Sequence, residues 1–395
     1  MDTATLVKKY NDEVVELRRL IHQNPELSNE EFETTKLIRR KLEEYGVEIA
    51  EIGMKTGVVG VLRGGKPGKT VAIREDIDAL RMPEETGLPF ASKVDGKCHS
   101  CGHDIHTAVL LGCAKVLAEI KEELSGNVLF LFQPAEENGT GANQLVDCRF
   151  WEVLQPDVFV GLHTAPAVPA GAISVKYGVT GASSDIFTIR VTGHGGHGAH
   201  PENCIDPIVI ASSIVLQLQT VVARELHPIQ PAVLTVGTIH GGTASNVIAD
   251  VVEISGTLRT LDNDTRQQAK DAMARIAKLT AESLRGSAEV IWAGAGMPVQ
   301  INDNAVVDAV IESAAKIVGK ENIRVLEHAS LGSEDFSVLY PKYAPGAQYN
   351  IGTQDPNDPN TALGIHNARN VFDERCLPVG VATLVEFTRD YLQEK

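Results

Sequence analysis

The 395-residue sequence contains no long hydrophobic run. No stretch approaches the roughly 18 uncharged apolar residues of a membrane-spanning helix, so we expect no membrane partner. The first twenty residues carry charges throughout and show no apolar core of a signal peptide. We therefore expect a cytoplasmic protein.

Positive charge is also scarce. Lysine and arginine number 36 against 52 aspartates and glutamates, which gives a formal net charge of −16. Nucleic-acid-binding proteins need a basic face, so we expect no nucleic-acid partner. Bound divalent cations would offset a little of this charge.

Cysteine is sparse and poorly paired. Six cysteines are spread over the chain, which favours reduced thiols over a disulfide framework. Cys98 and Cys101 form a single C-x-x-C, and no second such pair completes a four-cysteine zinc site.

The length and the hydrophobic pattern predict two domains. Short apolar runs that end abruptly in polar residues alternate with helical patterns, as in an α/β domain with buried parallel strands. A capping box at Ser28–Glu31 predicts a helix that runs to Gly46. From Ser184 the order changes to β-α-β-β-α-β, typical of a ferredoxin-like sandwich. We predict a catalytic domain of residues 1–183 and 297–395, interrupted by a small α+β domain of residues 184–296.

The segment 98–106, CHSCGHDIH, concentrates the side chains that bind zinc-class metals. These are Cys98, His99, Cys101, His103, Asp104 and His106. The segment either holds a metal ion or forms a very polar turn, and the rest of the sequence must decide between these two interpretations.

Further polar residues follow predicted strands. Asp76 and Asp78, the pair Glu136–Glu137, and His163 each come after an apolar run. In an open α/β sheet, ligands bind beyond the carboxyl ends of the strands, so these groups are expected on one rim with Cys101 and His103. Of two adjacent carboxylates, one can bind a metal ion while the other acts as a general base. A bound metal ion lowers the pKa of water from about 16 to about 7.

Nine motifs carry a resemblance to a known family: REDIDAL, CHSCGHDIHTAVLLG, FQPAEENGTGA, GLHT, GHGGHGAHP, GGTASNVIAD, GTLRTLD, GSEDFS and LGIHN. With these motifs in this order, the sequence resembles the M20 metallopeptidase family. It is most similar to the amidohydrolase branch of that family, which comprises aminoacylases, hippurate hydrolases and auxin-conjugate hydrolases. The resemblance implies a zinc-peptidase-like α/β catalytic domain with two divalent metal ions per subunit. It also implies an inserted lid domain through which the chain forms a homodimer or homotetramer, and an N-acyl amino acid or short peptide as substrate.

The resemblance also assigns roles to single residues. As metal ligands it implies Cys101, His103, Glu137, His163 and His366, with Cys101 as the bridging ligand. Glu136 would be the general base, and His197 of the lid would stabilise the oxyanion, in its own or a partner subunit's site. Asn246 and Arg259 would hold the substrate carboxylate. Asp76 and Asp78 would orient ligands, whereas Cys98, His99 and His106 would be structural neighbours.

Several positions depart from the usual pattern of the branch. They are Glu75, Arg81, Asn138, Thr140, His194, His200 and Ala368. None removes an implied ligand or the general base, so they bear on the shape of the substrate pocket.

The sequence predicts a metal-dependent amidohydrolase of N-acyl amino acids. A carboxypeptidase or dipeptidase of the same family stays open, because the scissile bond is also an amide. A thiol hydrolase that uses Cys101 and a non-catalytic metal-binding protein are further alternatives. Sulfur and nitrogen ligands suit zinc, and carboxylate-rich dinuclear sites also accept manganese or cobalt.

Overall fold

The computed structural model describes residues 2–340 and 342–393. The chain forms two compact units. The larger comprises Met1–Gly178, Ile301–His328 and Asp335–Lys395, and the smaller comprises Val179–Gln300 and Ala329–Glu334. The predicted smaller domain, 184–296, does not include the short segment 329–334.

The larger unit is built on an eight-stranded mixed sheet with the order β1-β2-β4-β3-β5-β16-β6-β15. Its middle strands, β4, β3, β5 and β16, are mutually parallel. The strands are β1 (Glu48–Ile49), β2 (Val58–Arg63), β3 (Lys66–Asp76), β4 (Ser125–Gln133), β5 (Val158–Pro169), β6 (Ile173–Val175), β15 (Ile323–Val325) and β16 (Gly346–Gln354). The prediction of an α/β fold with buried parallel strands is therefore confirmed.

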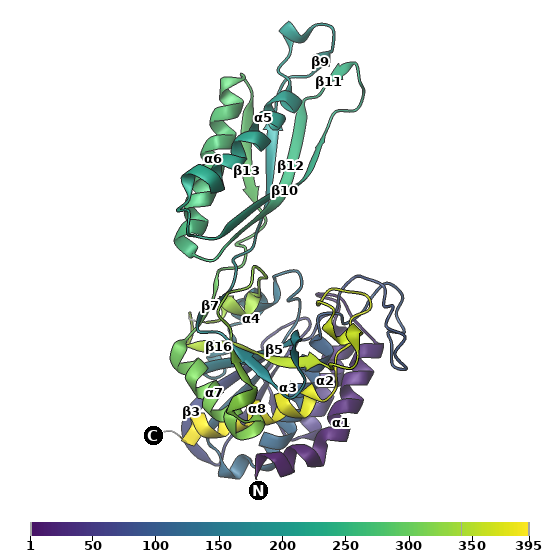
Figure 1. The fold of residues 1–395 in the computed structure, drawn as a ribbon, viewed down its shortest axis with the longest axis vertical. Coiled ribbons are helices and arrows are strands. Elements are labelled where there is room, and N and C mark those ends of the chain that lie inside the picture. Colours follow the sequence, from purple (N-terminus) through teal and green to yellow (C-terminus); the bar gives the residue numbers. More distant parts are fainter. Residues whose placement is uncertain (1, 341, 394–395) are drawn as a thin grey trace. The chain divides into compact units, whose positions relative to one another are not determined.

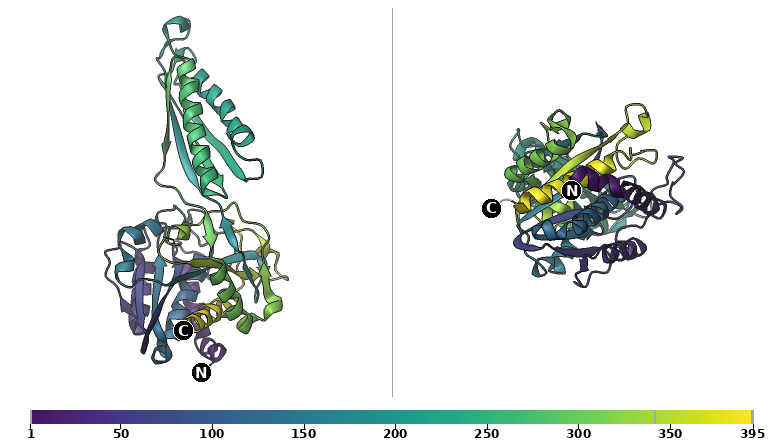
Figure 2. Two further views of the ribbon diagram at one scale, coloured as in Figure 1. Left: turned by 90° about the vertical axis from the view of Figure 1, so that its left-hand side faces the viewer. Right: turned by 90° about the horizontal axis from the view of Figure 1, so that it is seen from below.

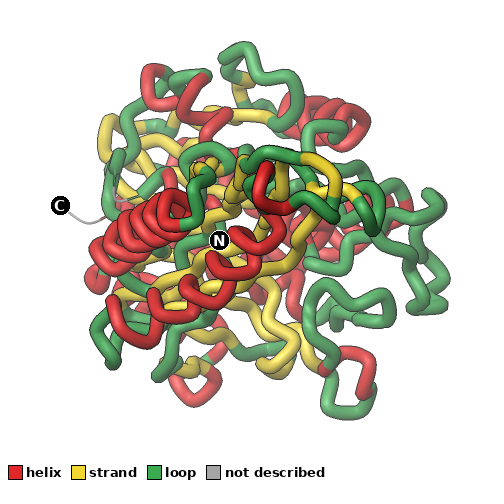
Figure 3. The backbone as a smooth tube through the Cα atoms, turned by 90° about the horizontal axis from the view of Figure 1, so that it is seen from above, coloured by secondary structure: helices red, strands yellow, loops and turns green. Residues whose placement is uncertain are grey.

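Helices cover both faces of this sheet (Figures 1 and 3). One face carries α1 (Thr3–Gln23), α2 (Phe32–Glu44), α3 (His103–Glu119), α7 (Asn304–Val318) and α8 (Cys376–Gln393). In the view from below, α1, α8 and α7 lie side by side (Figure 2). The other face carries α4 (Gly141–Asp147) and the 3-10 turns η2 (Phe150–Glu152) and η6 (Asp335–Val338). Further short 3-10 turns of the larger unit are η1 (Lys121–Glu123), η5 (Lys320–Asn322) and η7 (Pro359–Ala362).

Successive residues of the central strands enter different cores. Val71 and Ile73 of β3 pack with the five long helices, whereas Ala72 packs with the turns on the opposite face. Because side chains alternate across a strand, a strand buried on both faces is apolar along most of its length. This explains the continuous apolar runs of the sequence, and the last residues of β3, Arg74–Asp76, are buried polar groups that lead into the site.

The smaller unit has a four-stranded antiparallel sheet of order β10-β12-β8-β13. Its main elements are β8 (Asp185–Thr192), α5 (Pro207–Thr220), the π-helical η4 (Val221–Glu225), β10 (Ala232–Gly241), β12 (Val251–Thr260), α6 (Asn263–Ser283) and β13 (Ser287–Trp292). Phe187, Ile189 and Val191 of β8 face α5 and α6, as the period-two pattern predicts. Two short strands, β9 (Gly196–His197) and β11 (Val247–Ile248), pair with each other, and η3 (Pro201–Asn203) follows β9. The remaining short strands, β7 (Gly178–Gly181) and β14 (Gln300–Asn302), contain chain positions where one unit gives way to the other.

One helical stretch, Pro207–Glu225, is long and apolar enough to cross a membrane by length and composition alone. The sequence analysis expected no such stretch. A single helix of this kind is weak evidence, and Ile210, Ile214 and Leu218 on one of its sides belong to the core of the smaller unit.

The predicted capping box at Ser28 is wrong. Helix α2 begins at Phe32, with Glu31 at its N-cap and no side-chain cap. The Ser28 hydroxyl instead donates to Asp78 Oδ2 at 2.6 Å. The Ser28 hydroxyl, which a capping box requires, is therefore used in a tertiary hydrogen bond to a buried carboxylate.

Candidate metal centre

The site lies where the middle strands of the larger unit end and α3 begins. Asp76 closes β3, the pair Glu136–Glu137 follows β4, and His163 lies in β5. Cys101 and His103 flank Gly102, the N-cap of α3. Gly102 has φ of +94°, and a Cβ there would lie 2.6 Å from Thr164 Oγ1. Only glycine allows α3 to start this close to β5.

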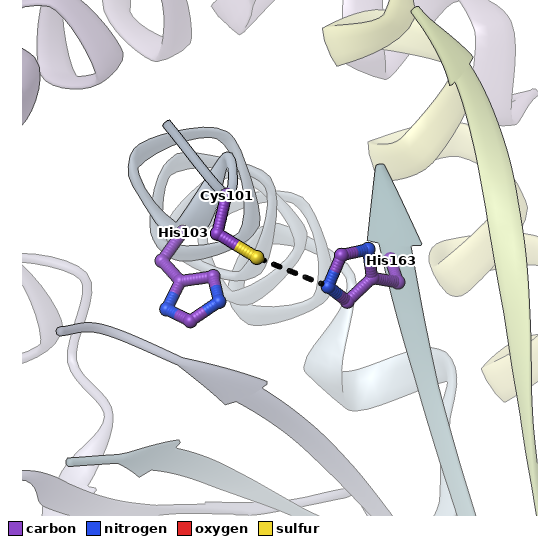
Figure 4. Close-up of side chains that lie close together, drawn as sticks. All are labelled: Cys101, His103 and His163. Carbon is purple, nitrogen blue, oxygen red and sulfur yellow. Dashed lines mark hydrogen bonds between the residues drawn. The ribbon is translucent and has the colours of Figure 1, made fainter. Parts of the chain in front are cut away.

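Cys101, His103 and His163 form one group of potential metal ligands, with one donor atom of each within 4.8 Å of the others. Cys101 Sγ points at His163 Nε2, 3.6 Å away, and the His103 ring lies beside them (Figure 4). The first two come from the start of α3 and the third from a strand 60 residues later in the chain.

A second group shares Cys101 and adds Glu137 and His366. His366 Nε2 lies 3.4 Å from Glu137 Oε1. The loop at His366 has a positive φ of 60° and is tied to the α3 region by a hydrogen bond from His366 N to Ser100 O. Two ligand groups with Cys101 in common match the arrangement expected of a dinuclear centre with a bridging thiolate.

The ring nitrogens are oriented by hydrogen bonds on their far sides. His163 Nδ1 donates to Thr164 O at 2.9 Å, and His103 Nδ1 lies 3.3 Å from Asp78 Oδ1. Such bonds leave each Nε2 with its lone pair directed into the site, as in histidine ligands of metals.

Two buried atoms of the site have no hydrogen-bond partner among the described residues, which fits a bound metal ion. They are His103 Nε2 and Glu137 Oε1, which lie 3.8 Å apart. A buried polar atom without a partner is costly. A divalent cation would satisfy both, and the sulfur, nitrogen and oxygen donors suit zinc, manganese or cobalt.

The electrostatic field of the site favours positive charge. Burial lowers the pKa of His103, but Asp76, Cys101 and Asp78 together outweigh burial, and the pKa lies well above its usual range. Burial also raises the pKa of Asp76, yet His103 and Arg74 lower it further, so that this carboxylate stays charged. The same charges that stabilise an imidazolium would stabilise a bound cation.

The other members of the segment 98–106 have different surroundings. His106 bridges Asp76 Oδ1, at 2.6 Å, and the backbone N–H of Thr164, at 3.0 Å. Burial lowers the pKa of His106 to about 4, which leaves it the neutral acceptor that Thr164 needs. Asp104 faces away from the donor atoms and pairs with Arg18 and His22 of α1.

Two buried carboxylates hold the loop that carries Glu136 and Glu137. Asp78 accepts the backbone N–H of Glu136 and that of Glu137, both at 3.1 Å. Glu31 accepts the N–H of Ala135 at 2.8 Å. Sequence reasoning identified Asp78 as an orienting residue but missed Glu31, which lies in a polar run that reads as the exposed start of a helix.

The three predicted residues of the smaller unit do not converge. His197 on β9 pairs with Val247 of β11, next to Asn246 (Figure 1). Arg259 lies near the far end of β12 and donates to Leu331 O at 2.9 Å. Residues 251–259 of this strand span roughly 25 Å at 3.3 Å per residue, so one copy of the unit cannot bring Arg259 and Asn246 to one small substrate.

A model of peptidase family M20/M25/M40 matches residues 72–390. Thermostable carboxypeptidase 2 of Saccharolobus solfataricus is 39% identical over 381 residues, covering 95% of this chain and 94% of the relative. N-acetyl-L-cysteine deacetylase of Bacillus subtilis is 41% identical over 359 residues, covering 91% and 83%. The crystal structure of a dinuclear metal-binding peptidase of the M20 family from Bacillus subtilis superposes with a TM-score of 0.82 at 36% identity, covering 98% and 99%.

Proposed function

The chain belongs to peptidase family M20/M25/M40 and is a hydrolase of amide bonds, and from this premise we propose that it is a metal-dependent amidohydrolase of N-acyl amino acids. The observation that carries the proposal is a pair of ligand groups with Cys101 in common, next to the carboxylate of Glu136. The ligands would be Cys101, His103, Glu137, His163 and His366, for two divalent ions of zinc, manganese or cobalt.

Glu136 would be the general base. When bound, the ions polarise the scissile carbonyl and acidify a water molecule. Glu136 then takes a proton from the attacking water and delivers it to the leaving amine. Its backbone N–H is held by Asp78, and its side chain is almost fully buried, so the carboxylate starts from a fixed position.

His197 is suited to stabilise the oxyanion. The backbone N–H of Ala199 donates to His197 Nδ1 at 3.1 Å. With its Nδ1 lone pair used as the acceptor, the neutral ring carries its proton on Nε2. That N–H is the donor which an oxyanion requires.

We infer that the site is completed by a second copy of the chain, in a homodimer or a larger assembly such as a homotetramer. Arg259 would bind the substrate carboxylate from one subunit, and His197 with Asn246 would come from the other. The smaller unit offers surface for such an assembly, because β10 is an edge strand and α5 exposes Ile208, Val209 and Leu216. Leu216 is the most exposed of the three, at 73%.

A substrate panel tests the activity. Metal-loaded protein would be assayed on N-acetyl-methionine, N-acetyl-cysteine and hippurate, and in parallel on Gly-Phe and benzyloxycarbonyl dipeptides. The proposal predicts the higher kcat/KM on the N-acyl amino acids. Preferential cleavage of the peptides would instead establish the second candidate, a carboxypeptidase or dipeptidase, which the similarity to a thermostable carboxypeptidase favours.

A further inference from the structure

We propose that Glu31 is a positioning residue for the Glu136–Glu137 pair. The inference rests on the proposed function for its catalytic consequence, but its effect on metal binding can be measured separately. Glu31 lies on none of the strand ends that supply the site, and the motifs that assign the site do not include it.

The contact of Glu31 with the site loop is short and buried. Its Oε1 accepts the N–H of Ala135 at 2.8 Å, and neither residue is accessible to solvent. Without this carboxylate, the Ala135 N–H would be a buried donor facing no water. A donor of this kind is expensive to leave unsatisfied, so the loop would shift to find another acceptor.

The backbone at Ala135 needs such an anchor because of its conformation. Ala135 has a φ of 55°, in the left-handed region that an alanine rarely adopts. Ala135 lies between the end of β4 and the acidic pair. Its dihedral angles therefore set the direction in which both carboxylates point. Strain of this kind persists only where the surroundings fix it.

Glu31 and Asp78 together hold three successive N–H groups. Glu31 takes that of Ala135, and Asp78 takes those of Glu136 and Glu137. Glu31 is itself fixed, because its carbonyl accepts the N–H of Thr35 in the first turn of α2. The direction of Glu136 and Glu137 is thereby set from the N-terminus of α2.

Glu31 holds this loop through a backbone N–H, that of Ala135. Its loss should therefore weaken metal binding through Glu137 and slow the reaction through Glu136, with little change in KM. Residues that support metal ligands in this way change affinity or activity by roughly 10- to 100-fold when they are replaced.

Three variants test the proposal in the full-length protein. Glu31→Met keeps the size of the side chain and removes the acceptor, whereas Glu31→Gln keeps an acceptor oxygen. Glu26→Gln is the matched control, because the Glu26 carboxylate also accepts N–H groups at the start of α2, those of Glu33 and Thr34. The measurements are the Kd for Co²⁺, from its absorbance spectrum, and kcat and KM on N-acetyl-methionine.

We expect Glu31→Met to raise the Kd for Co²⁺ and lower kcat by about tenfold or more, with KM within about threefold. Glu31→Gln and Glu26→Gln should stay within about threefold of wild type in all three quantities. A folded Glu31→Met protein with wild-type Co²⁺ affinity would overturn the proposal, as would an equal loss in Glu26→Gln.

Two further outcomes are also decisive. Should Glu31→Met not fold, Glu31→Asp serves in its place, because it keeps the charge and withdraws the acceptor by one methylene; wild-type Co²⁺ affinity in that variant would overturn the proposal. Should the wild-type holoenzyme hydrolyse no compound of the panel, the proposed function fails. The Co²⁺ affinities still decide the role of Glu31 in that case.

Discussion

Glu136 and Glu137 are neighbours in sequence, and the proposed function gives them different tasks. Glu137 Oε1 faces His103 and His366 and shares a ligand group with Cys101. Glu136 lies within reach of His103 and Glu137, but it shares no group with Cys101. We predict that Glu136→Gln lowers kcat by about 10²- to 10⁴-fold, the usual contribution of a general base. The metal content of the variant, measured by elemental analysis, should equal that of wild type. A variant that keeps its metal and full activity would contradict the assignment.

Glu31 should also affect the pH dependence of stability. Burial raises the pKa of its carboxyl from 4.5 to about 7. As the pH rises through this window, the unfolded chain releases the proton before the folded protein does, so folding becomes less favourable. We predict that wild type loses about 2 kcal/mol of stability relative to Glu31→Gln between pH 5 and pH 8.

Urea unfolding of the metal-stripped proteins at the two pH values measures this difference. A difference between wild type and Glu31→Gln that is the same at both pH values would show that Glu31 does not titrate in this range.

At the scale of elements, the contact between the start of α3 and β5 places Cys101 against His163. We predict that Gly102→Ala weakens Co²⁺ binding about tenfold or more, because its Cβ would lie 2.6 Å from Thr164 Oγ1 and push the two ligands apart. Gly96→Ala is the matched control, since Gly96 also has a positive φ but a Cβ there meets nothing within 4 Å. Equal effects of the two substitutions on Co²⁺ affinity would mean that backbone strain alone is responsible.

The regular elements were largely predictable from sequence because each pattern has a local cause. The runs around Val71 and Val128 are apolar because β3 and β4 are buried on both faces. The alternation in Phe187, Ile189 and Val191 reflects a sheet with one buried face. The predicted capping box at Ser28 was wrong. Whether a serine hydroxyl bonds to a local N–H or to a distant carboxylate depends on the tertiary fold.

Most of the site could be named only through family resemblance. Cys101, His163 and His366 are separated by dozens to hundreds of residues, and a single histidine after a strand carries no sign of its partners. Glu31 had no signal, because its acceptor role depends on Ala135, about a hundred residues later. The segment 329–334 was also missed, since nothing in its composition shows that it returns to the smaller unit.

The separation of Arg259 from His197 and Asn246 along β12 leads to a prediction about assembly. His197→Ala and Glu136→Gln should each be inactive alone, one for lack of the oxyanion donor and the other for lack of the base. If a partner subunit supplies His197, a mixed dimer of the two variants contains one complete site. The isolated mixed dimer should then have about half of wild-type activity, and an unseparated random mixture about a quarter.

Co-expression of the two variants with different affinity tags, followed by assay of the mixed species, measures the restored activity. Mixed dimers that stay as inactive as their parents would show that each subunit uses its own His197.

Amide hydrolysis by this chain should depend on metal occupancy. The decisive measurement is the rate of N-acetyl-methionine hydrolysis by metal-stripped protein as Zn²⁺, Mn²⁺ or Co²⁺ is added in known equivalents. We predict no activity without metal and a rise that saturates near two equivalents per chain, as expected for ligand groups that share Cys101. Full activity of the chelator-treated protein would contradict the account.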